Sequence, residues 1–372
     1  MNSFERIDAV LALEQPDRVP LSPILDHWAA TFTGISNAVL MSDPEERINA
    51  VIRTATSHRW DMTYLADLVN TPLLQVGVPA RLLFPGRDLP ADAAHQFDER
   101  GFMEDADYDI LVSEGIYPFI EAIATRIYPE MTLESALISL DSAGRHGVEA
   151  AARVCEAGIV PESGFILPGP SYEYFSLARG LERAMADLRE RPGVMKEAGR
   201  RYCRDMVELA MNAVDQIGIR RVFIGLSRSA ASFLSAPLFE EMVLPDLEYL
   251  VRSLLDAGIM PILHCDCDWT PFLHYFRRFP RARCFIELDG CTDIFEAKNI
   301  LGDTMAIKGD VPAELTALGS AEEVRRYCRR LIESVGAGGG FILSSGCSLP
   351  ANAKSGNVMA MTEAVEKWGR YE

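Results

Sequence analysis

A compact group of metal-binding side chains follows an apolar run, residues 259–263, in the second half of the chain. The run ends in four ligand-type residues: His264, Cys265, Asp266 and Cys267. A second apolar run, residues 340–344, is soon followed by Cys347. Thiolate and imidazole are the ligands that zinc selects. Zinc fingers use local pairs of ligands, so this different spacing predicts one open, three-ligand catalytic site shared by two strand ends.

Strand geometry leaves two ligand sets open. Because side chains alternate along a strand, His264 and Asp266 should point one way, and Cys265 and Cys267 the other. Cys347 would complete either set. A turn directly after His264 would instead bring Cys267 beside it, so Cys267 is also a candidate ligand.

Eight short apolar runs recur along the chain, and stretches with helical periodicity separate most of them. The runs cover residues 19–25, 61–65, 165–168, 221–226, 259–264, 284–288, 304–308 and 340–344. Strands that alternate with helices predict a parallel sheet with right-handed crossovers. Eight such units predict an α/β fold of the (β/α)8 TIM barrel type. A doubly wound sheet is the alternative, but the first run lacks its glycine-rich nucleotide fingerprint.

One long segment, residues 66–130, separates the second run from the third. It exceeds the ordinary length of a connection, so we interpret it as an N-terminal insertion that caps one end of the barrel. Within it, the turn residues of 73–85 predict a hairpin. We find no domain boundary elsewhere and expect residues 1–372 to form a single barrel domain.

Polar residues follow most of the predicted strands, and in a TIM barrel the loops after the strands carry the active site. The candidates in these loops, besides the metal ligands, are Asp26, His27, Asp67, Tyr172, Asp289 and Asp310. We predict catalytic roles for Asp289 and Asp310, although helix capping is the common role of aspartate at such positions. Asp26, His27 and Tyr172 are candidates for substrate binding, Tyr172 by stacking, although packing is the common role of such an aromatic residue.

Composition excludes several classes of function. The net charge of −18 is opposite to what a binder of nucleic acid needs. No apolar run is long enough to span a membrane, and the first residues lack the basic and apolar regions of a secretion signal. We therefore expect a cytoplasmic protein whose eight cysteines are reduced.

Several motifs, taken in their order along the chain, resemble the uroporphyrinogen decarboxylase superfamily. They are PDRVP at 16–20, DIFEAK at 293–298, GDVP at 309–312 and GFILSSGC at 340–347. The chain is most similar to the zinc- and corrinoid-dependent methyltransferase branch, which includes methylcobamide:coenzyme M methyltransferases. This resemblance implies bound zinc and a corrinoid (cobalamin) carried by a partner protein. It also implies transfer of a methyl group between that corrinoid protein and a small methylated substrate, for example a methoxylated aromatic or a methyl thiol.

The zinc motif of that branch looks like His-x-Cys on one strand and a further Cys on a later one. On this chain the resemblance gives His264 and Cys347 as ligands, with Asp266 in place of the middle cysteine. Either Asp266 supplies an oxygen ligand, or Cys265 or Cys267 substitutes for it. The decarboxylase branch is the alternative, but its Arg-rich motif near the first strand has no counterpart in residues 22–28.

Overall fold

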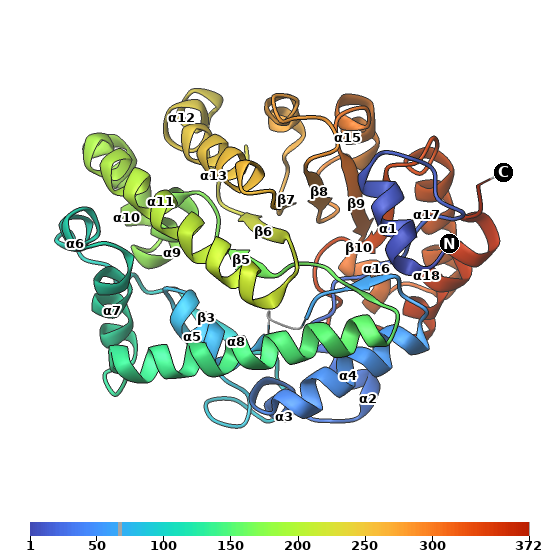
Figure 1. Cartoon of the computed structure of the whole chain (residues 1–372), viewed down its shortest axis with the longest axis horizontal. Coiled ribbons are helices and arrows are strands. Elements are labelled where there is room, and N and C mark those ends of the chain that lie inside the picture. The colour runs from blue at the N-terminus through green and yellow to red at the C-terminus, as the bar shows by residue number, and fades with distance from the viewer. Residues whose placement is uncertain (66–68, 372) are drawn as a thin grey trace.

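The computed structural model describes residues 1–65 and 69–371 (Figure 1). Asp67, one of the residues expected near the active site, lies outside the described residues. The two terminal segments lie side by side, because the amide of Val19 donates to the carbonyl of Gly369 at 2.8 Å. Within the described ranges, we find no helix with the length and apolar character needed to cross a membrane.

Six parallel strands form the main sheet, and each pairs with the next strand along the chain. They are β5 (Phe165–Leu167), β6 (Arg221–Leu226), β7 (Met260–Cys265), β8 (Phe285–Leu288), β9 (Ala306–Val311) and β10 (Phe341–Ser345). Two shorter strands, β1 (Met62–Thr63) and β4 (Val160–Pro161), pair in parallel with each other. Two more, β2 (Arg81–Leu83) and β3 (Gln96–Asp98), form an antiparallel pair.

Backbone hydrogen bonds join β10 to β1 through residues 19–25. The amide of Ser22 donates to the carbonyl of Leu343 in β10 at 2.9 Å. On the other side of the same segment, the amide of Asp61 donates to the carbonyl of Leu21 at 2.8 Å. Residues 19–25 therefore occupy the place of a strand between the last and the second apolar runs.

The remaining gap in the ring is closed between β1 and β5. The amide of Glu162 donates to the carbonyl of Thr63 at 2.9 Å, and residues 160–167 carry the chain from β4 directly into β5. The ring therefore consists of residues 19–25, residues 61–65, residues 160–167 and the strands β6 to β10. This arrangement confirms the predicted (β/α)8 barrel, and all eight apolar runs lie in its wall.

The inside of the barrel contains an apolar core that extends to the amino-terminal ends of its strands. Its buried core residues are Ile24, Met62, Tyr64, Val160, Phe223, Ile262, Phe285, Ala306 and Ile342. Helix α1 (Ser3–Leu11) adds Ile7, Val10 and Leu11 to this core and covers that end of the barrel. The opposite end, where the strands finish, is left for the polar residues.

The helices pack their apolar faces around the outside of the ring (Figure 1). In α17, for example, Val324, Cys328 and Leu331 recur at helical spacing and are buried. The other helices are α2 (Trp28–Thr33), α3 (Asn37–Ser42), α4 (Pro44–Ser57), α5 (Thr71–Gly77), α6 (Asp107–Glu114), α7 (Ile116–Ile127), α8 (Leu133–Glu156), α9 (Ser171–Ala178), α10 (Leu181–Glu190), α11 (Pro192–Ile217), α12 (Ala236–Met242), α13 (Leu244–Asp256), α14 (Leu273–Phe276), α15 (Ile294–Leu301), α16 (Ala313–Ala317) and α18 (Ser355–Trp368), while α17 itself covers Ala321–Ser334.

The predicted insertion contains α5, β2, β3, α6 and α7, and part of it reaches the carboxyl end of the barrel. Nδ1 of His95 lies 2.8 Å from Nε2 of His27, which follows residues 19–25. Arg228, which follows β6, donates to Oε2 of Glu99 at 2.7 Å. Residues 95–99 therefore connect two points on the rim of the barrel mouth.

The hairpin predicted for residues 73–85 is wrong. Residues Thr71–Gly77 form helix α5, because the side chain of Asn70 caps its first turn and Pro72 stands at a position that needs no donor. The strand that follows, β2, pairs with β3 further along the chain rather than with residues before it.

Candidate metal centre

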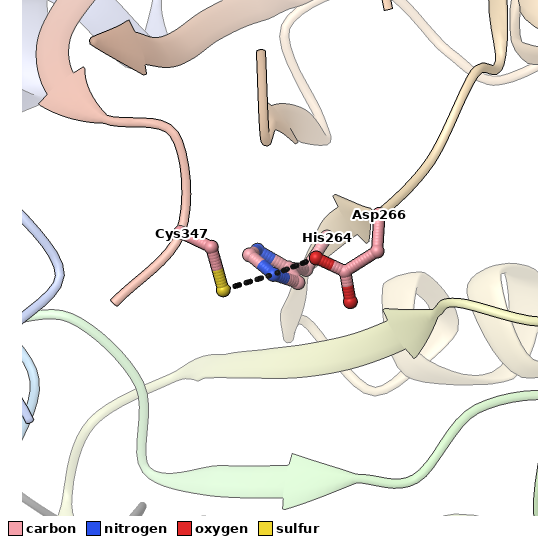
Figure 2. Close-up of side chains that lie close together, drawn as sticks. All are labelled: His264, Asp266 and Cys347. Carbon is pink, nitrogen blue, oxygen red and sulfur yellow. Dashed lines mark hydrogen bonds and ion pairs between the residues drawn. The ribbon is translucent and has the colours of Figure 1, made fainter. Parts of the chain in front are cut away.

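Three ligand-type side chains meet at the carboxyl end of the barrel (Figure 2). His264 belongs to β7, Asp266 follows that strand, and Cys347 lies just after β10. Nε2 of His264 is 3.2 Å from Oδ1 of Asp266 and 3.7 Å from Sγ of Cys347. One ligand atom of each residue lies within 4.8 Å of the other two. Among residues 1–65 and 69–371, this trio is the one group of three or more such residues with metal-binding spacing.

Two of the three separations between the donors fit a zinc ion. Donors bound at about 2.0–2.3 Å in tetrahedral geometry lie roughly 3.3–3.7 Å apart, close to the two measured separations of 3.2 and 3.7 Å. Imidazole nitrogen, thiolate sulfur and carboxylate oxygen are all zinc ligands in proteins. Three protein ligands would leave the fourth tetrahedral position open, as in catalytic zinc sites.

The face of β7 that points into the barrel selects one of the two ligand sets. His264 faces the inside of the barrel, where its ring lies 4.8 Å from that of Phe223. Cys265 is buried in the larger core, among the helices. Cys267 has a left-handed backbone with φ of 67°, and its amide donates to Oδ2 of Asp289 at 2.8 Å. The structure therefore brings Asp266 to His264 and Cys347, and Cys267 lies outside the trio.

Gly346 allows the loop that carries Cys347 to approach the end of β8. A β-carbon at position 346 would lie 2.1 Å from the carbonyl oxygen of Asp289 and 2.5 Å from its carbon. Both contacts are with backbone atoms, which cannot move aside as a flexible side chain could. Glycine is therefore needed here for close approach rather than for an unusual φ.

The other nitrogen of His264 is held by a residue that the sequence analysis did not single out. Nδ1 lies 2.9 Å from Oε2 of Glu287, which is buried in β8. A carboxylate that accepts the Nδ1 proton leaves Nε2 as the nitrogen that faces a metal. The sequence does mark Glu287 in one way, because it is a charged residue inside the apolar run 284–288. Lys308 stands out in the same way inside the run 304–308.

Electrostatic interactions favour the charged forms of His264 and Asp266. Burial lowers the pKa of His264, but Asp266, Cys347 and Glu287 raise it more, so that its net pKa lies well above the usual value. Burial raises the pKa of Asp266, but His264 and Ser227 lower it more, and the hydroxyl of Ser227 donates to Oδ2 of Asp266 at 2.7 Å. In the absence of metal, a proton on His264 therefore binds where a metal would, and a metal has to displace it.

Asp289 and Asp310, predicted to be catalytic, lie near the mouth but outside the trio. The carboxylate of Asp289 accepts the amides of Cys267 and Cys291, both at 2.8 Å, and so fixes two loops to each other. Asp310 is buried and accepts the hydroxyl of Tyr327 in α17 at 2.8 Å. Burial raises the pKa of Asp310, the hydroxyl of Tyr327 lowers it and nearby Asp289 raises it, and the net pKa is about 7.

The three residues predicted to bind substrate have different surroundings. His27 is buried beneath His95, and its Nδ1 has no hydrogen-bond partner in the described part of the chain. Asp26 lies beside it, with Oδ1 3.8 Å from Nε2 of His27. Tyr172 is fully buried and donates to Sδ of Met185 at 3.2 Å, so its ring packs in the interior, which agrees with the packing role rather than with stacking on a substrate.

A known structure shares this architecture. A methyltransferase from Methanosarcina mazei superposes with a TM-score of 0.73 at 14% sequence identity, over 99% of this chain and 99% of that chain. A family 2 AP endonuclease from Brucella melitensis reaches a TM-score of only 0.35 at 15% identity, over 57% of this chain and 81% of that one, which is too low to indicate a shared fold. The first likeness shows the fold.

Sequence comparison gives the family. No curated protein has a sequence that matches this chain. The model of the uroporphyrinogen decarboxylase (URO-D) family matches residues 148–368, which include every strand from β4 to β10 and all three members of the trio. Because this match covers more than half of the chain, it confirms the superfamily indicated by the motifs: the protein belongs to the uroporphyrinogen decarboxylase (URO-D) family.

Proposed function

We propose that this protein is a zinc-dependent methyltransferase that moves a methyl group between a small methylated substrate and a corrinoid protein. The observation that carries the proposal is the convergence of His264, Asp266 and Cys347 at the barrel mouth. The likeness in fold to a protein described as a methyltransferase supports the same reaction class. The corrinoid partner rests on the resemblance of the sequence motifs.

The chain supplies a prepared ligand set. His264 would bind through Nε2, Asp266 through a carboxylate oxygen and Cys347 through its thiolate. Bound zinc would act as a Lewis acid that lowers the pKa of a substrate thiol or stabilises an oxygen or sulfur leaving group. Glu287 holds the His264 ring, and Ser227 orients the carboxylate of Asp266. These contacts hold the ligand side chains in place before a substrate binds. Less conformational entropy is therefore lost when the site is assembled.

The charges at the mouth favour a neutral or cationic substrate. Arg228 is the one Lys or Arg in the loop segments 26–28, 169–172, 227–229, 265–268, 289–291, 310–312 and 346–348. Its guanidinium already donates to the carbonyl of Ser176 and to Glu99. The same segments contain five aspartates: Asp26, Asp266, Asp268, Asp289 and Asp310. An ether or thioether substrate fits these surroundings better than an anion does.

The alternative is a decarboxylase, which the name of the family model favours. A substrate with several carboxylates would need cationic side chains to bind them. The described mouth segments offer only the engaged guanidinium of Arg228. We therefore place decarboxylation second.

The test uses the purified chain loaded with zinc and free cob(I)alamin in place of the corrinoid protein. Methoxylated aromatics, methyl thiols, methylamines and methanol are screened as methyl donors, and methylcobalamin is followed by its absorbance. We expect methylcobalamin to form with at least one donor class and to disappear in the His264→Ala variant. Release of carbon dioxide from a carboxylated substrate, with no methyl transfer from any donor, would establish the alternative instead.

A further inference from the structure

A chain of charged side chains lies inside the barrel beneath the trio. Nζ of Lys308 lies 2.5 Å from Oε1 of Glu162 and 2.7 Å from Oε1 of Glu287. All three side chains are almost completely buried. They come from three different parts of the ring, namely residues 160–167, β8 and β9.

The fold alone does not require this group of charges. The interior of a TIM barrel is usually filled with branched apolar side chains, as the core below Lys308 shows. Burying three ionisable groups costs several kcal/mol of desolvation per ion. Apolar residues of similar volume are often neutral or stabilising at such positions, so a role at the neighbouring site is the better explanation for the charges.

The chain of charges ends at the metal centre. Oε1 of Glu287 accepts from Lys308, while Oε2 lies 2.8 Å from the hydroxyl of Tyr64 and 2.9 Å from Nδ1 of His264. Both carboxylate oxygens are therefore fixed, and the carboxylate cannot rotate without losing a contact. Nζ of Lys308 also lies 4.9 Å from the centre of the Tyr64 ring. The two residues that donate to Glu287, Lys308 and Tyr64, are therefore in contact with each other.

We propose that Lys308 is a positioning residue for the metal centre. With Tyr64, it holds the carboxylate of Glu287 in the orientation that receives the Nδ1 proton of His264, so that Nε2 is presented to the metal. Glu162 anchors the far side of the ammonium group. The part that concerns metal binding rests on the proposed function, whereas the orientation of His264 can be measured without metal.

The charge state of Lys308 agrees with this role. Burial lowers the pKa of Lys308, but Glu162 and Glu287 raise it more, so the ammonium stays protonated. Burial raises the pKa of Glu162, Lys308 lowers it and Glu287 raises it again, so that its net pKa lies well above the usual value. Replacing Glu162 by glutamine keeps an oxygen acceptor for Lys308.

The first experiment measures zinc affinity by competition with a chromophoric chelator. Loss of a group that orients a metal ligand typically lowers affinity about 10–100-fold, and we expect a loss in this range for Lys308→Met. The comparison variant, Glu162→Gln, keeps an oxygen acceptor for Lys308 and should therefore lose less zinc affinity than Lys308→Met. The cobalt(II) absorption spectrum should change in Lys308→Met only. Wild-type zinc affinity in Lys308→Met would overturn the proposal.

A second variant covers the case in which Lys308→Met fails to fold. The double change Glu162→Gln and Lys308→Met removes the carboxylate that would face no cation, and it should restore folding while zinc affinity stays low. Equal zinc affinity in this variant and the wild type would contradict a positioning role. The melting temperatures of the metal-free proteins are measured alongside. If Lys308 had a purely structural role, stability and zinc affinity would change together in these variants.

The second experiment needs no metal. In protein labelled with ¹⁵N-histidine, the Nδ1 proton of His264 should give a protected, downfield signal, identified by its loss in His264→Gln. We expect the signal to persist in Glu162→Gln and to broaden or vanish in Lys308→Met. Persistence in Lys308→Met would refute the inference. If the wild type binds no zinc but shows this pattern, the proposed function fails and the positioning role stands.

Discussion

Nε2 of His264, in β7, lies 3.7 Å from Sγ of Cys347, although 83 residues separate the two along the chain. The barrel brings them together because β7 and β10 both end at the same mouth. A contact of this kind cannot arise from local sequence and depends on closure of the ring. The metal centre should therefore be sensitive to changes that alter how these strand ends approach one another.

The first such change is Gly346→Ala. The added β-carbon would collide with the backbone of Asp289 and push the loop of Cys347 outward. We expect zinc affinity to fall by at least about ten-fold, since misplacing one ligand costs of the order of 1–3 kcal/mol. Chelator competition measures this. The matched control is Gly356→Ala in α18, where a β-carbon meets nothing within 4 Å. An equal response of the two variants would contradict the close-approach argument.

The identity of the middle ligand gives the second prediction. Asp266→Cys should keep zinc bound at one ion per chain, because a thiolate can replace a carboxylate in a tetrahedral site. The Asp266→Ala variant should lose most of its zinc, because two protein ligands rarely hold zinc. The zinc content of each variant after gel filtration distinguishes these outcomes. Retention of zinc in Asp266→Ala would show that Cys265 or Cys267 takes the place of Asp266.

Asp310 gives a pH-dependent prediction for stability. Its pKa is raised to about 7 in the folded protein, compared with about 3.9 in an unfolded chain. Between these values the folded state keeps a proton that the unfolded state has lost, so the free energy of unfolding falls as the pH rises. The contribution is constant below about 4 and is fully lost above about 7.

Asp310→Asn removes this titration and keeps an oxygen acceptor for Tyr327. Its free energy of unfolding, relative to the wild type, should therefore rise by about 1–4 kcal/mol between pH 5 and pH 8. Urea denaturation of both proteins at the two pH values gives the difference. A relative stability that does not change with pH would show that Asp310 is ionised in both states.

The barrel could be predicted from the sequence because each segment of its wall is a short apolar run. Such runs are the strongest local signal of a buried strand. The ligand set could be predicted only in part. His264 and Cys347 followed from residue type and position, but the choice of Asp266 over Cys267 depends on the left-handed backbone at Cys267 and its bond to Asp289. Alternation along an extended strand alone could not decide between the two sets.

Other features depend on contacts that the sequence does not reveal. Glu287 and Lys308 each lie in an apolar run, and only the closed ring shows that they face each other and His264. Tyr172 follows a strand, as a mouth residue should, but α9 turns its ring into the core. The helix at 71–77 was mistaken for part of a hairpin because glycine and proline signal turns as well as helix ends.

The most direct test of the central claim is the zinc stoichiometry of the purified chain and three single variants. We expect one zinc per wild-type chain and per Cys267→Ala chain, since Cys267 is the neighbouring cysteine outside the trio. His264→Ala and Cys347→Ala should each lose most of the metal. Full zinc retention in both of these variants would contradict a metal centre built from the two strand ends.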